Sequence, residues 1–133
     1  MSYEESLKSI TLNADASLAV YTGVSGVPGS PALNYGKQYR FVKVTGIHQC
    51  GLATAAADPI VGVLQSKPQQ AGQESTIAIF GVSNLMAGGV FVAGDAVEAD
   101  ANGRAVKSAG AGIGIALDAS TGADTLVPVL LKL

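Results

Sequence analysis

The chain has 133 residues, of which 48% are hydrophobic and 14% charged, and its formal net charge at pH 7 is −2. This length suits one domain with a core of its own, and so weak a charge offers no basic surface for a nucleic acid. The aromatic content is 5%, with no Trp, whereas Gly reaches 17 residues. A core of small aliphatic side chains broken by many glycines favours layered β-sheets over a helical bundle.

The start of the chain, MSYEESLKS, lacks the apolar run of a secretion signal, and no segment has the length and apolar character of a membrane span. We therefore expect a protein that is made in a cytoplasm and has no membrane partner. The single cysteine, Cys50, excludes an internal disulfide.

The first predicted strand lies in ITLNADASLAVY, residues 10–21, where apolar and polar side chains alternate. A period of two places one set of side chains on each face of a strand. The pattern predicts one strand, or two short strands bent at residues 13–15.

Residues 22–36, TGVSGVPGSPALNYG, follow this strand. They combine Gly, Ser and Pro so densely that neither a helix nor a sheet could continue through them, and we expect a loop or linker. This segment sets the predicted domain boundary. Residues 1–36 form an N-terminal arm and Gly/Pro-rich loop, and residues 37–133 form a compact β-domain.

Short apolar runs divided by turn residues fill the rest of the chain. Runs of this spacing are typical of a β-sandwich or a small β-barrel with short hairpins. ATAAAD, residues 53–58, predicts one or two helical turns at most. The predicted strands lie in residues 38–46, 59–66, 75–83, 89–94, 112–120 and 125–133, and in the two arms around Asn102–Gly103.

Two parts of the predicted domain resemble each other. Residues 61–80 and 113–131 each hold a β-branched residue, a glycine and another β-branched residue. In each, a polar turn with Gly72 or Gly122 follows, and then a threonine opens an apolar strand. The likeness predicts two similar hairpins that pack across the core.

The stretch EADANGRAVK, residues 98–107, allows two interpretations. Its alternating acidic and amide residues ahead of a glycine resemble the first half of a calcium loop, but Ala109 stands where the loop needs a bidentate carboxylate. Asn-Gly is the preferred pair of a two-residue type I′ hairpin. The hairpin interpretation places Glu98 opposite Lys107.

His48 and Cys50 are the one histidine and the one cysteine of the chain. A cysteine enzyme would use them as base and nucleophile, but no third catalytic residue follows in a recognisable pattern, and two ligands are too few for structural zinc. A histidine at a sheet edge beside a small buried cysteine is the simpler interpretation. The glycines of residues 86–95 also lack the spacing of a phosphate loop. We expect no enzyme activity, no cofactor and no metal.

Four segments of the domain resemble the head-decoration, or capsid cement, proteins of tailed bacteriophages. Each segment alone is ordinary turn chemistry, and the likeness rests on their order along the chain from Phe41 to the C-terminus. The segments are FVKVTG (41–46), DPIVGVLQSKPQQAGQESTIAIFG (58–81), GGVFVAGDAVEADANGRAV (88–106) and GIGIALDASTGADTLVPVLL (112–131).

The resemblance implies a small β-barrel or β-tulip domain that binds the outer surface of a phage head and stabilises it. The implied partner is the major capsid protein, the implied state on the capsid is a homotrimer, and the implied location is the outside of the virion. In related proteins an N-terminal arm becomes ordered on the capsid and extends one of its sheets, and the arm here, Ser2 to Tyr21, has the alternation that strand addition needs. The capsid-contact candidates on this arm are Ile10, Leu12, Leu18, Val20 and Tyr21.

Two other functions also fit the composition. A phage fibre, spike or tail component shares the richness in Gly, Ala and Val, although no fibrous period is evident. A carbohydrate-binding β-module could use tyrosines as a platform. The tyrosines are Tyr3, Tyr21, Tyr35 and Tyr39.

Overall fold

The structure is a computed structural model that describes residues 7–19 and 36–132. In these residues every regular element is a β-strand, and none forms a helix that could cross a membrane. The predicted all-β fold with a small barrel is thus confirmed. The strands are Lys8–Ala14 (β1), Phe41–Gly46 (β2), Gln49–Leu52 (β3), Ile60–Leu64 (β4), Glu74–Met86 (β5), Ala96–Ala99 (β6), Ala105–Lys107 (β7), Gly114–Ala116 (β8) and Leu126–Leu131 (β9).

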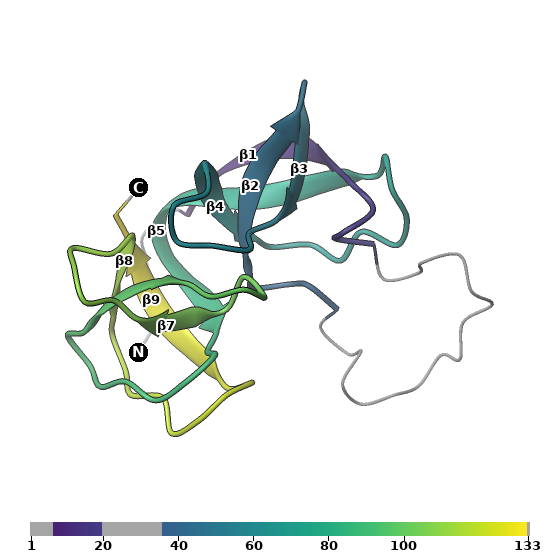
Figure 1. Cartoon of the computed structure of the whole chain (residues 1–133). Coiled ribbons are helices and arrows are strands. Elements are labelled where there is room, and N and C mark those ends of the chain that lie inside the picture. Colours follow the sequence, from purple (N-terminus) through teal and green to yellow (C-terminus); the bar gives the residue numbers. More distant parts are fainter. Residues whose placement is uncertain (1–6, 20–35, 133) are drawn as a thin grey trace.

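The first five strands close a small barrel (Figure 1). Their order is β1-β3-β2-β4-β5, and β5 pairs back with β1 from Lys8 to Asn13. All these pairs are antiparallel except β1 and β3, which pair in parallel at Asn13 and Ala14. A first hydrophobic cluster joins the barrel strands to the turn after β1, and it contains Ala14, Leu18, Val42, Cys50, Leu64 and Ile77.

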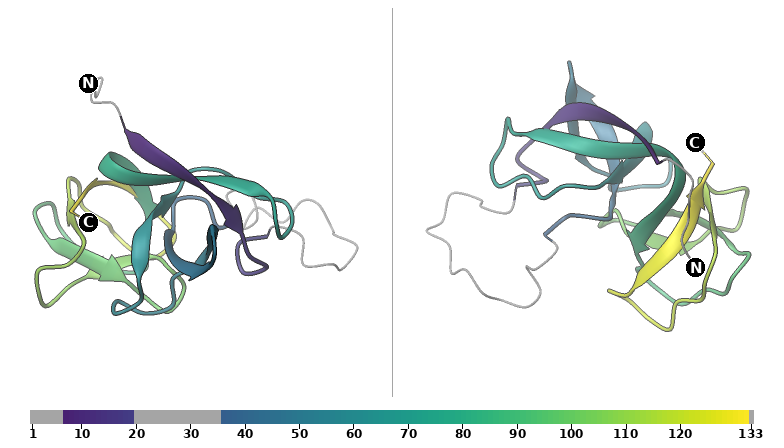
Figure 2. Two further views of the ribbon diagram at one scale, coloured as in Figure 1. Left: turned by 90° about the horizontal axis from the view of Figure 1, so that it is seen from above. Right: turned by 180° about the vertical axis from the view of Figure 1, so that it is seen from behind.

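Strand β5 carries the chain from the barrel into a second sheet. Its first half pairs with β1 and β4, and residues 81–86 pair with β9. At the change-over the β1–β5 register shifts between Lys8 and Ser9, and Gly81 has a φ of 104°. A bulge and a glycine with positive φ turn a strand sharply. Figure 2 shows β5 as one long curved strand shared by both parts.

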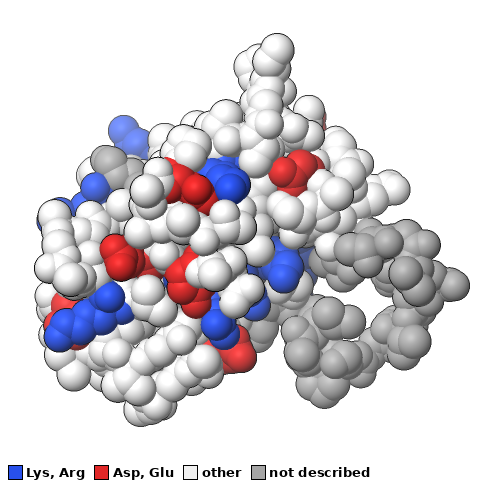
Figure 3. Space-filling view, viewed as in Figure 1, with Lys and Arg blue, Asp and Glu red and all other residues white. Residues whose placement is uncertain are grey.

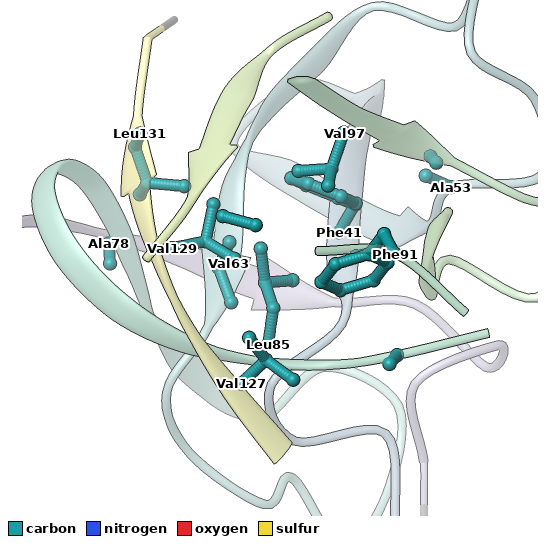
Figure 4. Packing of buried hydrophobic residues seen from close by; sticks show 14 residues of the cluster. Phe41, Ala53, Val63, Ala78, Leu85, Phe91, Val97, Val127, Val129 and Leu131 are labelled. Atoms are coloured by element: carbon teal, nitrogen blue, oxygen red, sulfur yellow. The ribbon is translucent and has the colours of Figure 1, made fainter. Parts of the chain in front are cut away.

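The second sheet is antiparallel and has the order β5-β9-β8-β6-β7. It packs on the barrel through a second hydrophobic cluster, in which Phe41 and Val63 from the barrel meet Leu85, Phe91 and Val127 (Figure 4). Phe41 is fully buried and Phe91 is 2% exposed. This shared cluster unites the two sheets in one body.

The sequence likeness between residues 61–80 and 113–131 corresponds to two hairpins, β4–β5 and β8–β9. The prediction of two hairpins is confirmed, and residues of both, such as Val63 and Val129, share the second hydrophobic cluster. The two hairpins join edge to edge through β5 and β9, which gives the order β4-β5-β9-β8.

A close contact with the neighbouring strand explains the glycine that the two hairpins share. A Cβ on Gly62 would lie 2.0 Å from the carbonyl oxygen of Ala78, and a Cβ on Gly114 would lie 2.6 Å from Val129 Cγ1. Atoms at these distances overlap. Each hairpin therefore depends on a glycine at this place.

The strands differ from the prediction in two places, one predicted strand that is absent and one strand that was not predicted. Residues 89–94 contain a single bridge, between Phe91 and Ser120, in place of a strand. Strand β3 was not predicted, because QCGL has no clear alternation and its hydrogen-bond partners are β1 and β2. Such pairings with distant segments are invisible to local patterns.

Residues 53–58 form a turn, so the predicted helical turns are wrong. Asp58 Oδ2 accepts hydrogen bonds from the backbone N–H of Thr54 at 2.8 Å and of Ala55 at 3.1 Å, and from Lys43 Nζ at 3.1 Å. A carboxylate that binds the backbone locally competes with a helix, and Pro59 follows. The pKa of Asp58 is lowered to about 2, first by the Thr54 N–H and then by Lys43.

The tight packing of Gly62 predicts that Gly62→Ala destabilises the fold. We expect a loss of about 1–3 kcal/mol in the free energy of unfolding, because the added methyl group overlaps the backbone of β5. Gly122→Ala is the matched control, since nothing lies within 4 Å of a Cβ there; we expect a change within about 0.5 kcal/mol. Urea unfolding measures both, and equal stabilities of the two variants would contradict the close approach.

The Asp58 network predicts a loss of stability in acid. Because the folded pKa of Asp58, about 2, lies below the ordinary value of 3.8, its contribution is complete above about pH 5 and is lost as the pH falls towards 2. Asp58→Asn should lower the melting temperature at pH 7 and flatten this acid dependence. Asp118→Asn removes a carboxylate from an exposed position and is the control. Melting curves from pH 2 to 7 that match wild type for Asp58→Asn would refute the network.

Candidate functional site

The predicted capsid-contact residues fall in different surroundings. Ile10, on β1, is 38% exposed, Leu12 is partly buried against the barrel cluster, and Leu18 is fully buried in that cluster. Val20 and Tyr21 lie outside the described residues. In this conformation Ile10 is the accessible candidate, whereas Leu18 stabilises the barrel.

The segment predicted as an arm contains a strand of the barrel. β1 pairs with β5 along most of its length and with β3 at its end. The turn after β1 is also held to the barrel, because the backbone N–H of Leu52 donates to Ser17 Oγ at 2.8 Å. The division of the chain at residue 36 stays a prediction, and a truncation there would remove a barrel strand together with the arm.

Exposed large apolar side chains of the described residues lie in three regions. Such side chains mark interaction surfaces where they form patches. Val44 and Ile47 belong to the β2–β3 hairpin, Leu7, Ile10, Phe80 and Leu130 lie around the bend of β5, and Val90, Val92 and Leu117 lie in loops of the second sheet.

The β2–β3 hairpin is the region that sequence reasoning missed. Its end projects from the barrel (Figures 1 and 3) and carries Ile47, which is 93% exposed. The available signal was TGIHQ, in which an isoleucine stands directly after a glycine inside a turn. A turn residue of that kind lies outside the chain's own core.

Charged side chains form a compact network where the β6–β7 loop meets the barrel. Arg104 Nε lies 3.1 Å from Asp100 Oδ2, and its Nη1 lies 3.2 Å from Asp124 Oδ1. Arg40 Nη1 donates to the carbonyl of Asn102 at 3.0 Å. Burial, and then the charge of Arg104, lowers the pKa of Arg40. These contacts hold the β6–β7 loop against the barrel. Figure 3 shows positive and negative side chains mixed on the face of the molecule that it displays.

The hairpin around Asn102–Gly103 is confirmed, but its turn and register differ from the prediction. Val97 lies opposite Lys107, and Glu98 lies opposite Val106. The expected Glu98–Lys107 pair is therefore wrong, and Lys107 Nζ lies 3.7 Å from Asp95 Oδ1.

A side chain explains the changed turn. Asp100 Oδ1 accepts from the backbone N–H groups of Asn102 and Arg104, both at 2.8 Å, which lengthens the loop by one residue. Gly103 has a φ of 70°, whereas Asn102 is not among the residues with positive φ that a type I′ turn requires. The carbonyl of Gly103 accepts from the N–H of Phe41 at 2.8 Å, so the loop docks on the barrel.

His48 and Cys50 have separate structural roles. Cys50 is fully buried, and burial, followed by the charge of Asp15, raises the pKa of its thiol to about 11. His48 lies in the exposed turn with a φ of 52°, and its carbonyl accepts from the N–H of Asn13 at 2.8 Å. A thiol that stays protonated at neutral pH is a poor nucleophile, which agrees with a buried structural cysteine.

The tyrosine platform is largely outside the described residues, which include Tyr39 alone of the four. Tyr39 joins the two sheets: its N–H donates to the carbonyl of Leu64, and its carbonyl accepts from the N–H of Met86, both at 2.7 Å. Among the described residues, no group of three or more His, Cys, Asp or Glu side chains is placed to hold a metal ion.

Most of the chain matches one protein family. The phage cement protein family matches residues 32–131. The chain belongs to this family. The fold of this cement protein is similar to the crystal structure of the head fiber gp8.5 N base in bacteriophage phi29, with a TM-score of 0.63, 16% sequence identity, and coverage of 96% of this chain and 98% of that chain. At such low identity the likeness shows a shared fold. No curated protein sequence matches the chain.

The burial of Cys50 predicts a thiol that does not react in the folded protein. Its pKa of about 11 leaves about one thiolate in a thousand at pH 8, and the barrel blocks access. A thiol-specific reagent at pH 8 should label the native protein at least about 100-fold more slowly than the urea-unfolded protein. Equal labelling rates would contradict the buried site.

Proposed function

We propose that this cement protein binds the outer surface of its phage's capsid and clamps neighbouring capsid subunits together. Membership of the phage cement protein family carries the proposal, and it makes the protein a structural component of the phage head with a capsid-stabilising role. The described architecture supports that role. Two sheets share one strand and one hydrophobic cluster, which gives a stiff body whose exposed apolar groups lie on hairpins and loops.

The proposed mechanism is multivalent binding without chemistry. Each copy buries a modest patch on two or more capsid subunits, and many weak clamps together resist expansion of the shell. A homotrimer around a local threefold axis would place three patches on the shell at once, because such a closed ring repeats one interface. The protein would be made in the host cytoplasm and act on the outside of the virion, with the major capsid protein as its partner.

The absence of a catalytic step is part of this proposal. Cys50, the one candidate nucleophile of the cysteine-enzyme hypothesis, supports the first hydrophobic cluster and carries a protonated thiol at neutral pH. A Cys50→Ala variant that binds heads as wild type does would agree with a purely structural cysteine.

The similarity to a head fiber base supports a second candidate function. The N base of head fiber gp8.5 in bacteriophage phi29 shares this fold over nearly the whole chain. The protein could therefore be the base of a fibre on the phage head. Both functions require binding to the head, and they differ in whether the bound protein itself raises the resistance of heads to heat.

The proposed function predicts saturable binding to heads that lack the protein. Purified protein should co-sediment with heads of its own phage and raise the temperature at which they disrupt. Bound protein that leaves this temperature unchanged would favour the fibre base. If the folded protein binds no heads, both proposed functions are wrong.

A further pair of variants tests the arm candidate. Ile10→Ser should weaken head binding by about three- to tenfold if this partly exposed side chain contacts the capsid. Thr11→Ser, at the neighbouring exposed position of β1, is the control. Wild-type binding by a folded Ile10→Ser variant would remove Ile10 from the contact surface and leave the proposed function intact.

A further inference from the structure

We propose that the end of the β2–β3 hairpin is the capsid anchor of this cement protein and inserts Ile47 into an apolar depression on the outer capsid surface. The proposal rests on the proposed function and adds the residues that make the contact. We call residues 44–49, VTGIHQ, the hairpin tip.

Ile47 presents a large apolar side chain to solvent. Its side chain is 93% exposed, compared with 70% for Val90, the next of the large apolar residues in the described part of the chain. Val44, on the same tip, is 44% exposed. Full burial of an isoleucine in a partner is worth roughly 10- to 100-fold in affinity. Even one such side chain per copy matters for a clamp that acts in many copies.

The hairpin tip is held in place before it meets a partner. β2 and β3 pair down to Gly46 and Gln49, with a bulge after Val44. The carbonyl of His48 accepts from Asn13 N–H at 2.8 Å, which ties the tip to β1. A projection whose backbone is already ordered loses little entropy on binding, and this suits an anchor.

The chemistry of the tip selects an uncharged partner surface. Residues 44–49 contain no Asp, Glu, Lys or Arg, so the tip offers the aliphatic side chains of Val44 and Ile47 among polar residues that carry no carboxylate, ammonium or guanidinium group. The hairpin end is convex (Figures 1 and 3). A convex hairpin tip with an exposed isoleucine fits a concave apolar site on a partner.

Membership of the phage cement protein family favours the capsid as that partner. The parallel pairing of Asn13 with Gln49 brings the end of β1 beside the start of β3, directly next to the tip. Ile10, the accessible arm candidate, lies farther back along β1, where it pairs with Ile77 of β5. The tip therefore lies beside the end of β1 in the barrel, whereas Val90 lies in a loop of the second sheet.

The decisive experiment compares Ile47→Asp with Val90→Asp in titrations of full-length protein against heads that lack it. Both variants place a charge at an exposed aliphatic position, so both should melt as wild type does. We expect Ile47→Asp to weaken binding at least tenfold and Val90→Asp to bind as wild type. Ile47→Val should retain most of the affinity, because it keeps the aliphatic surface.

The other possible results of these titrations separate the anchor from the proposed function. Wild-type binding by Ile47→Asp overturns the anchor and leaves the proposed function standing, and loss with Val90→Asp alone assigns the contact to the second sheet. If Ile47→Asp changes the oligomeric state in sedimentation velocity but not head binding, the tip contacts a second copy and the capsid anchor is refuted. Failure of wild-type protein to bind heads would instead refute the proposed function.

Discussion

Both sheets of the protein depend on strand β5, because this strand belongs to each of them. Its first half closes the barrel against β1 and β4, and its second half begins the second sheet against β9. Its side chains divide in the same way, because Ile77 enters the barrel cluster while Ala78 and Leu85 enter the cluster between the sheets. The bulge and the positive φ of Gly81 set the angle between the sheets.

Small residues make this arrangement possible. Gly62 lets β4 approach β5 closely, Gly114 does the same for β8 and β9, and Gly103 seats the β6–β7 loop on the barrel. The composition, rich in Gly and poor in aromatic residues, is therefore a condition of close packing between strands. The exposed large apolar side chains of the described residues lie outside this core, and hairpins and loops carry most of them.

The fold alone does not determine the function of this protein, because one fold can serve several roles. The match to the phage cement protein family assigns a structural role on the head, and the likeness to a head fiber base shows that a similar β-framework occurs in another head-associated protein. In the barrel, large apolar side chains are exposed on the hairpin tip, at Val44 and Ile47, and on β1, at Ile10.

The β-class, most strand positions, the paired hairpins and the existence of a hairpin at Asn102–Gly103 could be predicted from the sequence, because alternation and turn chemistry act within a few residues. Which strands pair with each other depends on contacts that only the folded chain makes. The tertiary structure made β1 a barrel strand, buried Leu18, added β3 and exposed Ile47. It also let Asp100 and Asp58 reshape local turns. Long-range pairing and side-chain hydrogen bonds join residues that no local pattern relates, and the projection of the β2–β3 hairpin with Ile47 at its end is a result of that pairing.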